Sequence, residues 1–306
     1  MTDSENPLVS IGIPTYNRPD GLRRTLECMR GQSYGNLEII VSDNASPDPR
    51  VGECLDECRA ADPRVRVHVQ PENRGAIDNF NFVLEQATGE YFLWAADDDE
   101  WSPTFIEDCL REFASAPPGT VAVALEAQYT RGPGRFEFFP EGRPFYAYAS
   151  DRPAERLRHM LRYNYGNLYY SLFRREALSQ DGATVFRCLD LKSFNEIPVL
   201  LFVMRQGNWR VSPRVGLYKS TTEPTYLQAR WEMLGGRLPP VPMRVHLRDA
   251  FGNVLKYHLL ALGDILSSLG RIRIGTLDVI GLRAMSCVLL GRHFLACLLR
   301  RKGRAF

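Results

Sequence analysis

The segment "LVSIGIPTYNRPDGLRRTLECMRG", from Leu8 to Gly31, contains a predicted strand, a polar turn and a predicted helix in close succession. Its residues are mostly apolar up to Pro14, which is typical of a buried strand. The apolar residues after the turn recur at helical spacing and define one helix face: Leu22, Leu26 and Met29. We expect this helix to have Asp20 as its N-cap and to end at Gly31.

The same alternation continues along the next sixty residues. Two apolar strand-like runs and a short amphipathic segment follow: "LEIIVSD" (37–43), "VGECLDECRA" (51–60) and "VRVHV" (65–69). Residues 51–60 are predicted to form a short helix, and a third helical pattern then precedes a fourth strand: "AIDNFNFVLEQATG" (76–89) and "YFLW" (91–94). Strands that alternate with helices of about ten residues predict an α/β fold with a mainly parallel sheet.

Four consecutive acids follow the fourth strand, in "YFLWAADDDEWSP" from Tyr91 to Pro103. Like charges this close repel one another, and burial would raise their pKa values unless a cation or several donors compensated them. Residues 97–100 are therefore either a solvated acidic turn or a cation site. Trp101, which comes next, is compatible with stacking on a ligand or with a place in the core.

The position of the acids in the predicted sheet favours the cation site. In open α/β sheets, ligands bind beyond the carboxyl ends of the strands. The segments just past the first, second and fourth predicted strands are "PTYNR" (14–18), "SDNASPD" (42–48) and "DDDE" (97–100). Their hydroxyl, amide and carboxylate groups should meet on one rim, which is less expected of an arbitrary surface turn.

Composition limits the class of protein. With 306 residues, 44% hydrophobic and 24% charged, the chain is typical of a globular protein and not of a disordered one. The seven cysteines show no zinc or redox spacing, so we expect free thiols in a reducing cytosol. The N-terminal residues lack the pattern of a signal peptide.

The C-terminal part differs from the rest. A breaker-rich linker, "GGRLPPVPM" (235–243), follows a first predicted domain, residues 1–220, and residues 221–306 are predicted to be helical and basic. No apolar run there reaches the roughly 18–20 residues of a membrane-spanning helix. The arginines of residues 271–304 suggest an anionic partner, either lipid or nucleic acid, although a packed helical subdomain is an equally good interpretation.

Together the motifs resemble the inverting glycosyltransferases of family 2, which have the GT-A fold. The resemblance rests on "VSIGIPTYNRPDGLRRTL", "LEIIVSDNASPD", "ENRG" and "DDDEWSP" in this order. It implies a Rossmann-like GT-A domain over residues 1–220, with a mainly parallel sheet flanked by helices, and a C-terminal helical appendage over residues 221–306. It also implies transfer of a hexose or deoxyhexose from a nucleoside-diphosphate donor to an acceptor hydroxyl, with inversion and with help from Mn²⁺ or Mg²⁺.

The resemblance also assigns site residues. The donor nucleotide would be bound by Thr15, Tyr16, Arg18, Asp43, Arg74 and Asp97. The metal ligands would be Asp98 and Asp99, although many relatives carry an aspartate where this chain has Ala96, so the division of work among the acids stays open. The general base would be Glu196, at a spacing before a glycine like that in relatives, with Asp190 as the alternative.

The acceptor is predicted less directly. The variant motifs are most similar to a branch that decorates O-antigen and other cell-surface glycans. This likeness implies a cytoplasmic enzyme, peripheral at the inner membrane face, that acts on a glycan or lipid-linked acceptor and contacts an anionic membrane surface through its basic C-terminus. A soluble natural product is the alternative acceptor. We expect no nucleic-acid partner, because the basic tail lacks interleaved aromatic residues.

Two other functions stay open at this stage. A nucleotidyltransferase would use a similar sheet and similar metal chemistry, but the first loop lacks the closely spaced glycines of a phosphate-binding turn. A non-catalytic protein that kept the fold and binds sugar nucleotides is conceivable because of Ala96.

Overall fold

The computed structural model describes residues 6–131, 134–137, 150–163, 167–191, 196–220, 262–269, 283, 286 and 287. The first half of the described chain alternates strands and helices: β1 (Val9–Thr15), α1 (Pro19–Arg30), β2 (Leu37–Asp43), α2 (Pro49–Ala61), β3 (Val65–Val69), α3 (Gly75–Glu85), β4 (Tyr91–Trp94), β5 (Asp99–Trp101) and α4 (Phe105–Ala114). This order agrees with the alternating strands and helices predicted from the hydrophobic periodicity of the first hundred residues.

The later elements are less regular. They are β6 (Thr120–Arg131), β7 (Gly134–Glu137), α5 (Pro153–Tyr163), the 3₁₀ turn η2 (Asn167–Tyr170), β8 (Leu172–Arg174), the 3₁₀ turn η3 (Arg175–Leu178), β9 (Ser179–Gln180), β10 (Ala183–Thr184), α6 (Val185–Leu189), α7 (Glu196–Gln206) and β11 (Asn208–Ser220). Residues 262–269 form a further helix. Residues 132–133 and 138–149 lie outside the described residues.

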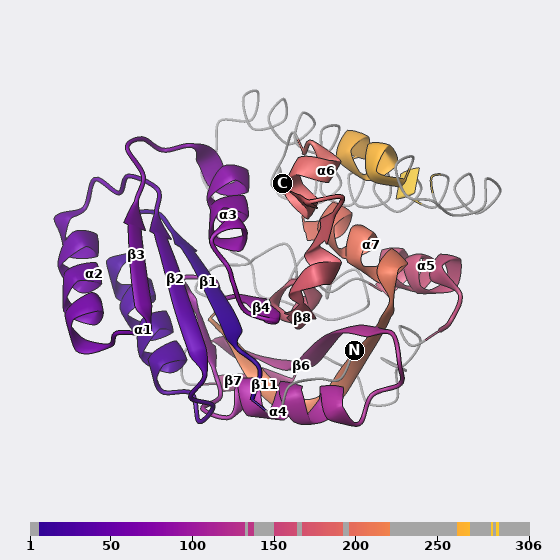
Figure 1. Ribbon diagram of the computed structural model, residues 1–306, viewed down its shortest axis with the longest axis horizontal. Coiled ribbons are helices and arrows are strands. Elements are labelled where there is room, and N and C mark those ends of the chain that lie inside the picture. The colour runs from indigo at the N-terminus through magenta and orange to yellow at the C-terminus, as the bar shows by residue number, and fades with distance from the viewer. Residues whose placement is uncertain are drawn as a thin grey trace, which may run out of the picture.

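Nine of the described strands form one mixed sheet, in the order β3-β2-β1-β4-β8-β6-β11-β5, with β7 paired to β6. The short strands β9 and β10 form a separate antiparallel pair. Neighbouring strands in the β3-β2-β1-β4 half are parallel, as are β6 and β11. The antiparallel neighbours are β8, which lies between β4 and β6, β5, which lies at the edge beside β11, and β7, which pairs with β6. The prediction of a mainly parallel sheet flanked by helices is confirmed (Figure 1).

Two apolar cores lie on opposite faces of this sheet. Along β1, Ile11 and Ile13 pack into a core with α1, α2 and α4, whereas Gly12 between them faces Val83 of α3. The alternation follows from the pleat, in which successive side chains point to opposite faces. Because both faces are covered, β1, β2 and β4 are fully buried, as expected for a parallel sheet.

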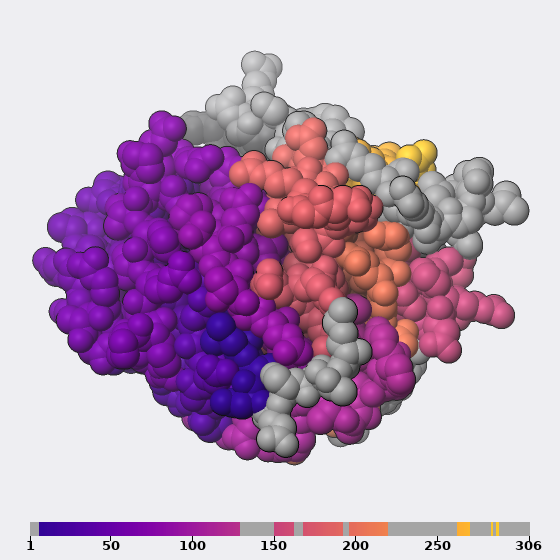
Figure 2. Space-filling model, viewed as in Figure 1, coloured from indigo at the N-terminus to yellow at the C-terminus, as the bar shows by residue number. Residues whose placement is uncertain are grey.

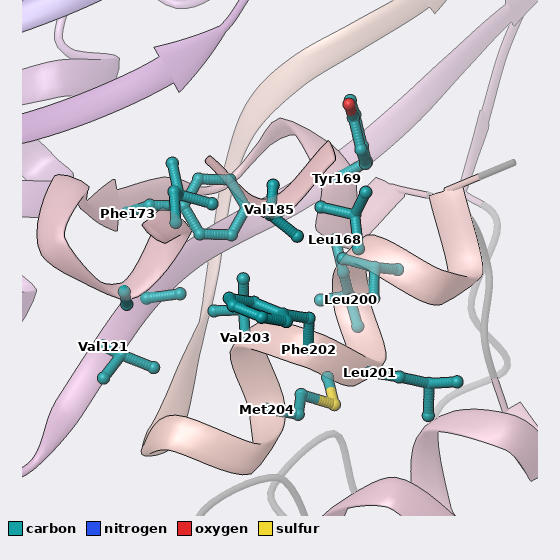
Figure 3. Close-up of a cluster of buried hydrophobic side chains, with 14 of the residues drawn as sticks. Val121, Leu168, Tyr169, Phe173, Val185, Leu200, Leu201, Phe202, Val203 and Met204 are labelled. Carbon is teal, nitrogen blue, oxygen red and sulfur yellow. The ribbon is translucent and has the colours of Figure 1, made fainter. Parts of the chain in front are cut away.

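The core on the α3 face joins the two halves of the chain. Trp94 is fully buried, stacks on Tyr169 with ring centroids 4.8 Å apart, and donates a hydrogen bond of 3.1 Å from Nε1 to the Phe80 carbonyl oxygen. Figure 3 shows Tyr169 and Phe173 together with the apolar residues of α7. This core would lose several large contacts if α7 moved away from the sheet.

The helix at residues 262–269 belongs to the same core. Ile265 and Leu269 are buried there together with residues of α5, α6 and α7. This part of the predicted C-terminal appendage is therefore packed onto the first domain. The basic segment that was predicted to meet anionic lipid, residues 271–304, lies almost wholly outside the described residues. In the described part of the chain, no helix is both long and apolar enough to cross a membrane.

The start of α1 differs from the prediction. The helix begins at Pro19, so Arg18 occupies the N-cap position and Asp20 lies in the first turn. Proline is favoured at the first helical position because its missing N–H would have no partner there, and it restricts the preceding residue to non-helical conformations. As a result, the side chain of Arg18 projects from the turn between β1 and α1.

The first turn of α1 lies directly against the backbone of Asp97. A Cβ atom on Gly21 would come within 2.2 Å of the Asp97 carbonyl oxygen, so only glycine fits without movement. We predict that Gly21→Ala lowers the free energy of unfolding by about 1–3 kcal/mol, because overpacking forces backbone shifts. Urea unfolding measures this change.

Gly52 in α2 supplies the control. A Cβ atom there meets no heavy atom within 4 Å, and its position is exposed. Gly52→Ala should therefore stabilise the protein by about 0.5–1 kcal/mol through helix propensity alone. Equal effects of the two substitutions would contradict the close contact at Gly21.

Candidate functional site

The carboxyl ends of β1, β2 and β4 meet at one edge of the sheet, as predicted. Thr15 ends β1 and is the register partner of Asp43, which ends β2. The hydroxyl of Thr15 donates a hydrogen bond of 2.8 Å to Asp97 Oδ2, just past the end of β4. The three polar segments that the sequence placed on one rim are therefore in direct contact.

Asp43 holds the loop that follows β2. Its carboxylate is buried and accepts hydrogen bonds from the backbone N–H of Ser46, at 3.2 Å, and from the Ser46 hydroxyl. The oxygen of that hydroxyl also accepts a hydrogen bond of 2.8 Å from the backbone N–H of Asn17. Asp43 thereby fixes the loops after β1 and β2 relative to each other.

Arg74 lies on the neighbouring turn. It is exposed and occupies the N-cap position of α3, and its backbone N–H donates a hydrogen bond of 2.9 Å to Asn44 Oδ1. The amide of Asn44 donates in turn to Asn73 Oδ1 at 2.9 Å and to the Gly75 carbonyl oxygen. Asn44 is thus a positioning residue that the sequence analysis did not single out. Its signal was its place directly after the acid that ends β2.

Asp97 and Asp98 converge on one cationic nitrogen. Nη1 of Arg18 lies 3.1 Å from Asp97 Oδ1 and 2.7 Å from Asp98 Oδ2. Burial raises the pKa of Asp97, and the charge of Arg18 and the hydrogen bond from Thr15 oppose this rise. The Asp98 side chain is 52% exposed, so it is the more accessible of the two acids.

Asp99 points to a different cation. It begins β5, is paired in register with Lys219 of β11, and is only 3% exposed. Nζ of Lys219 lies 2.5 Å from Asp99 Oδ2 and 4.3 Å from the centre of the Tyr170 ring. Burial raises the pKa of Asp99, and the charge of Lys219 opposes the rise. Lys219 was missed at the level of sequence, because nothing local connects it to Asp99.

Glu196 begins α7 in the same neighbourhood. Burial raises its pKa to about 7; the charge of Lys219 lowers the value and that of Asp99 raises it. Burial likewise raises the pKa of Tyr170, with further contributions from Glu196 and Asp99. Asp190, the alternative base, is exposed and ends α6 in a left-handed conformation with φ of 49°. The structure thus brings Glu196 near the acids, and the catalytic role of either residue stays a prediction.

The surroundings of the acid run explain two further features. Ala96 is buried in the apolar core on the α1 face, where an aspartate would place a carboxylate among apolar side chains. Thr25 of α1 donates hydrogen bonds from its hydroxyl to the carbonyl oxygens of Ala96 and Asp99, at 2.9 and 3.1 Å. Trp101 is only 3% exposed and belongs to the same core, so a stacking role on an exposed ligand is wrong.

The donor set at the rim fits a divalent cation held by a pair of carboxylates, those of Asp97 and Asp98. Across the described ranges no group of three or more His, Cys, Asp or Glu side chains is arranged to hold a metal ion. Two carboxylate oxygens, from Asp97 and Asp98, already converge on a single positive centre. Mg²⁺ and similar hard cations are commonly held by one or two carboxylates, with waters and substrate phosphates as the other ligands.

The two halves of the protein also meet along α3. Thr184 of β10 donates a hydrogen bond of 2.5 Å to Asn81 Oδ1 of α3, and Arg187 of α6 lies 3.2 Å from Glu85 of α3. Figure 2 shows the N-terminal residues and the later residues as two adjoining parts of one face. These contacts hold α6 against α3.

Comparison with known proteins agrees with this geometry. The sequence profile described as "Glycosyl transferase family 2" matches residues 10–180, more than half of the chain. The chain belongs to glycosyl transferase family 2. The matched region contains the strands and helices that build the rim, from β1 to β9.

Several curated proteins are similar over part of the chain. The glycosyltransferase GlyG of Streptococcus pneumoniae is 31% identical over 138 residues, which are 45% of each chain. The putative teichuronic acid biosynthesis glycosyltransferase TuaG of Bacillus subtilis is 34% identical over 101 residues, 33% of this chain and 40% of TuaG. The putative colanic acid biosynthesis glycosyl transferase WcaA of Escherichia coli is 37% identical over 100 residues, 32% of this chain and 35% of WcaA. The matched segments thus span less than half of these relatives.

Solved structures show the fold. TarS 1-349 of S. aureus matches with a TM-score of 0.58 and 16% identity, over 97% of this chain and 92% of that one. The mannosyltransferase PcManGT from Pyrobaculum calidifontis, solved with GDP-Man and Mn²⁺, matches with a TM-score of 0.52 and 17% identity, over 97% and 87%. The expected GT-A fold is confirmed by these neighbours.

Loss of Lys219 should leave Asp99 buried without its cation. We predict that Lys219→Met lowers the free energy of unfolding at pH 8 by roughly 3 kcal/mol, because one partner of a buried pair is removed. Burial already holds the pKa of Asp99 above its usual value, so ionising it costs more in the folded than in the unfolded chain. The loss should therefore shrink as the pH falls and Asp99 takes up a proton. Urea unfolding between pH 8 and pH 5 tests this dependence.

The double variant Asp99→Asn/Lys219→Met is the control, because it removes both charges. It should be more stable than Lys219→Met at pH 8 and should lack the extra pH dependence. A loss in Lys219→Met that does not vary with pH would contradict the pairing.

Proposed function

We propose that the protein is a metal-assisted, inverting glycosyltransferase that moves a hexose or deoxyhexose from a nucleoside diphosphate to an acceptor hydroxyl. The observation that carries the proposal is the convergence of Asp97 and Asp98 on one cationic centre, at the edge where β1, β2 and β4 end. Membership of glycosyl transferase family 2 supports the reaction class. Both carboxylates are intact, which favours an active enzyme over a non-catalytic relative.

The donor nucleotide would bind on the β1 and β2 side of this edge. Tyr16 is 44% exposed there, an unusual exposure for a large aromatic side chain, and is free to pack on a base. Thr15, which precedes Tyr16, and Asp43 and Arg74, which lie at or near the ends of the adjoining loop contacts, are the other proposed nucleotide-binding residues on this side. The solved neighbours include TarS with UDP-GlcNAc and PcManGT with GDP-Man, which supports a nucleotide sugar as donor here.

A divalent cation, Mn²⁺ or Mg²⁺, would offset the charge that grows on the leaving diphosphate. We propose Asp97 and Asp98 as its protein ligands. Asp99 fits this role less well than expected, because its carboxylate lies against Lys219. Asp99 would instead fix the edge strand β5 against β11. The two proposed ligands, Asp97 and Asp98, directly precede β5.

Glu196 is the proposed general base. An inverting transfer needs a group that takes the proton of the attacking hydroxyl, and such a group works best with a pKa near the operating pH. The pKa of Glu196, about 7, meets this requirement, and its charge interacts with those of Asp99 and Lys219. Asp190 is the alternative, and it is exposed.

The proposed role is the assembly of cell-surface polysaccharide or glycolipid on the cytoplasmic side of the membrane. TuaG and WcaA, whose names refer to teichuronic and colanic acid biosynthesis, are the support for this assignment. The acceptor would be a glycan or a lipid-linked sugar, with a soluble natural product as the alternative. Peripheral contact with the inner membrane face would come from the basic residues beyond position 270.

Nucleotide binding tests the donor assignment. With Mn²⁺ present, one of UDP, GDP, CDP and dTDP at about 100 times its Kd should stabilise the protein by roughly 2.7 kcal/mol and raise its Tm by several degrees. Asp98→Asn should lose the part of this shift that depends on Mn²⁺. Asp56→Asn, an exposed substitution in α2, is the matched control and should keep it. No shift with any of the four nucleotides would contradict the donor proposal.

The pH dependence of turnover tests the base. The rate of donor hydrolysis or of transfer should rise with pH through an apparent pKa near 7. Glu196 must lose its own proton before it can accept the proton of the attacking hydroxyl. Glu196→Gln should lower kcat by about 100-fold or more and remove this limb of the profile. Asp190→Asn should keep both the rate, within about fivefold, and the limb. The opposite result for the two variants would assign the base to Asp190.

A further inference from the structure

Arg18 occupies the point on which the two proposed metal ligands converge. A single atom, Nη1, contacts one oxygen of Asp97 and one of Asp98. Charge-assisted contacts of this kind are stronger than neutral hydrogen bonds. In the absence of any other cation, the guanidinium therefore neutralises a pair of carboxylates that would otherwise repel each other across adjacent residues.

The backbone around Arg18 is fixed on both sides. The Leu22 N–H donates a hydrogen bond of 2.9 Å to the Arg18 carbonyl oxygen, and the Asn17 N–H donates to the Ser46 hydroxyl at 2.8 Å. On the other side of the contact, Gly21 packs against the backbone of Asp97. Separation of the guanidinium from the acids therefore requires rotation of the Arg18 side chain, not movement of the loop. That side chain is 56% exposed, and exposed side chains change rotamer within nanoseconds.

We infer that Arg18 is an internal counter-cation, which competes with the divalent metal for the same oxygens of Asp97 and Asp98. This inference rests on the proposed function. A hard cation approaches carboxylate oxygens to about 2.0–2.1 Å, whereas Nη1 already lies within 3.1 Å of both, so the two positive centres would be in near contact. Repulsion at such a separation excludes simultaneous binding.

A diphosphate gives the displaced guanidinium a new partner. Arginine binds phosphate oxygens through two parallel N–H donors, so the same side chain suits both the acids and the donor. The metal-free enzyme would thus present a neutralised acid pair to an incoming anion, and the cation would take over the acids as Arg18 turns to the phosphates. Metal binding in the absence of nucleotide is correspondingly weak, since it must break both contacts of Arg18 without replacing them.

The first experiment measures Mn²⁺ binding to the nucleotide-free protein by titration calorimetry. At about 0.15 M salt, the Debye length is about 8 Å, so distant charges contribute little. Arg18→Met should bind Mn²⁺ about tenfold more tightly than the wild type, within the usual range of coupling between sites. Arg18→Lys keeps a cation near the acids and should stay within about threefold of the wild type; equal tightening in both variants would overturn the competition.

Arg24→Met is the matched control. Arg24 lies on the same helix, is 49% exposed, and pairs at 3.7 Å with Glu100, two residues after Asp98. Its loss removes one positive charge from the neighbourhood without uncovering Asp97 or Asp98. Its Mn²⁺ affinity should change less than twofold. Tightening of the same size in Arg24→Met and Arg18→Met would show a long-range charge effect and overturn the inference.

The second experiment measures nucleotide binding without metal. In EDTA, the nucleoside diphosphate that stabilises the wild type should bind Arg18→Met about tenfold more weakly, because two bare carboxylates then face the phosphates. If the wild type binds Mn²⁺ and a nucleotide, and Arg18→Met binds both with the same affinities, the inference about Arg18 is overturned and the proposed function is not. A wild type that binds neither Mn²⁺ nor any of the four nucleotides would overturn the proposed function as well.

Discussion

The site depends on the hydrogen bond between Thr15 and Asp97, which joins the end of β1 to the segment after β4. The bond is possible because β1 lies between β2 and β4 in a parallel arrangement, so all three carboxyl ends face the same way. The α1 helix, which enters directly after β1, then fits against the Asp97 backbone only because residue 21 is glycine. The order of the strands, the position of α1 and the position of Asp97 therefore depend on one another. Together they determine where the other polar groups of the rim lie.

The run of acids is stable because each acid has a different environment. Asp97 and Asp98 share Arg18, Asp99 is paired with Lys219, and Glu100 lies near Arg24 at the surface. Repulsion along the run is therefore balanced by cations from two separate parts of the chain, α1 with its N-cap and β11. Burial of Asp99 beside Lys219 also sets the electrostatic surroundings of Glu196, at the start of α7. The same charges that allow the acids to be buried thus influence the proposed base.

Local patterns in the sequence predicted the β1–β4 half of the sheet, the helices that follow those strands and the meeting of three polar segments on one rim. Those features depend on periodicity and on a general rule for parallel sheets. The pairing of Asp99 with Lys219 was not predictable, because it requires the antiparallel contact of β5 with β11, far apart in the chain. The burial of Trp101 and the start of α1 at Pro19 likewise depend on packing and on backbone geometry. The roles of the individual site residues stay predictions.

The helix at residues 262–269 changes how the C-terminal part of the chain can be divided. Ile265 and Leu269 fill the core that also contains Tyr169 and the apolar face of α7, the helix that begins at Glu196. Residues 262–269 therefore pack onto the first predicted domain, residues 1–220, and the division of the chain at residue 220 stays a prediction. A shortened protein that ends at residue 220 would lack Ile265 and Leu269 and would expose apolar residues of α7, the helix that begins at the proposed base. A deletion that tests the proposed membrane contact and leaves this core intact would remove only residues beyond position 269.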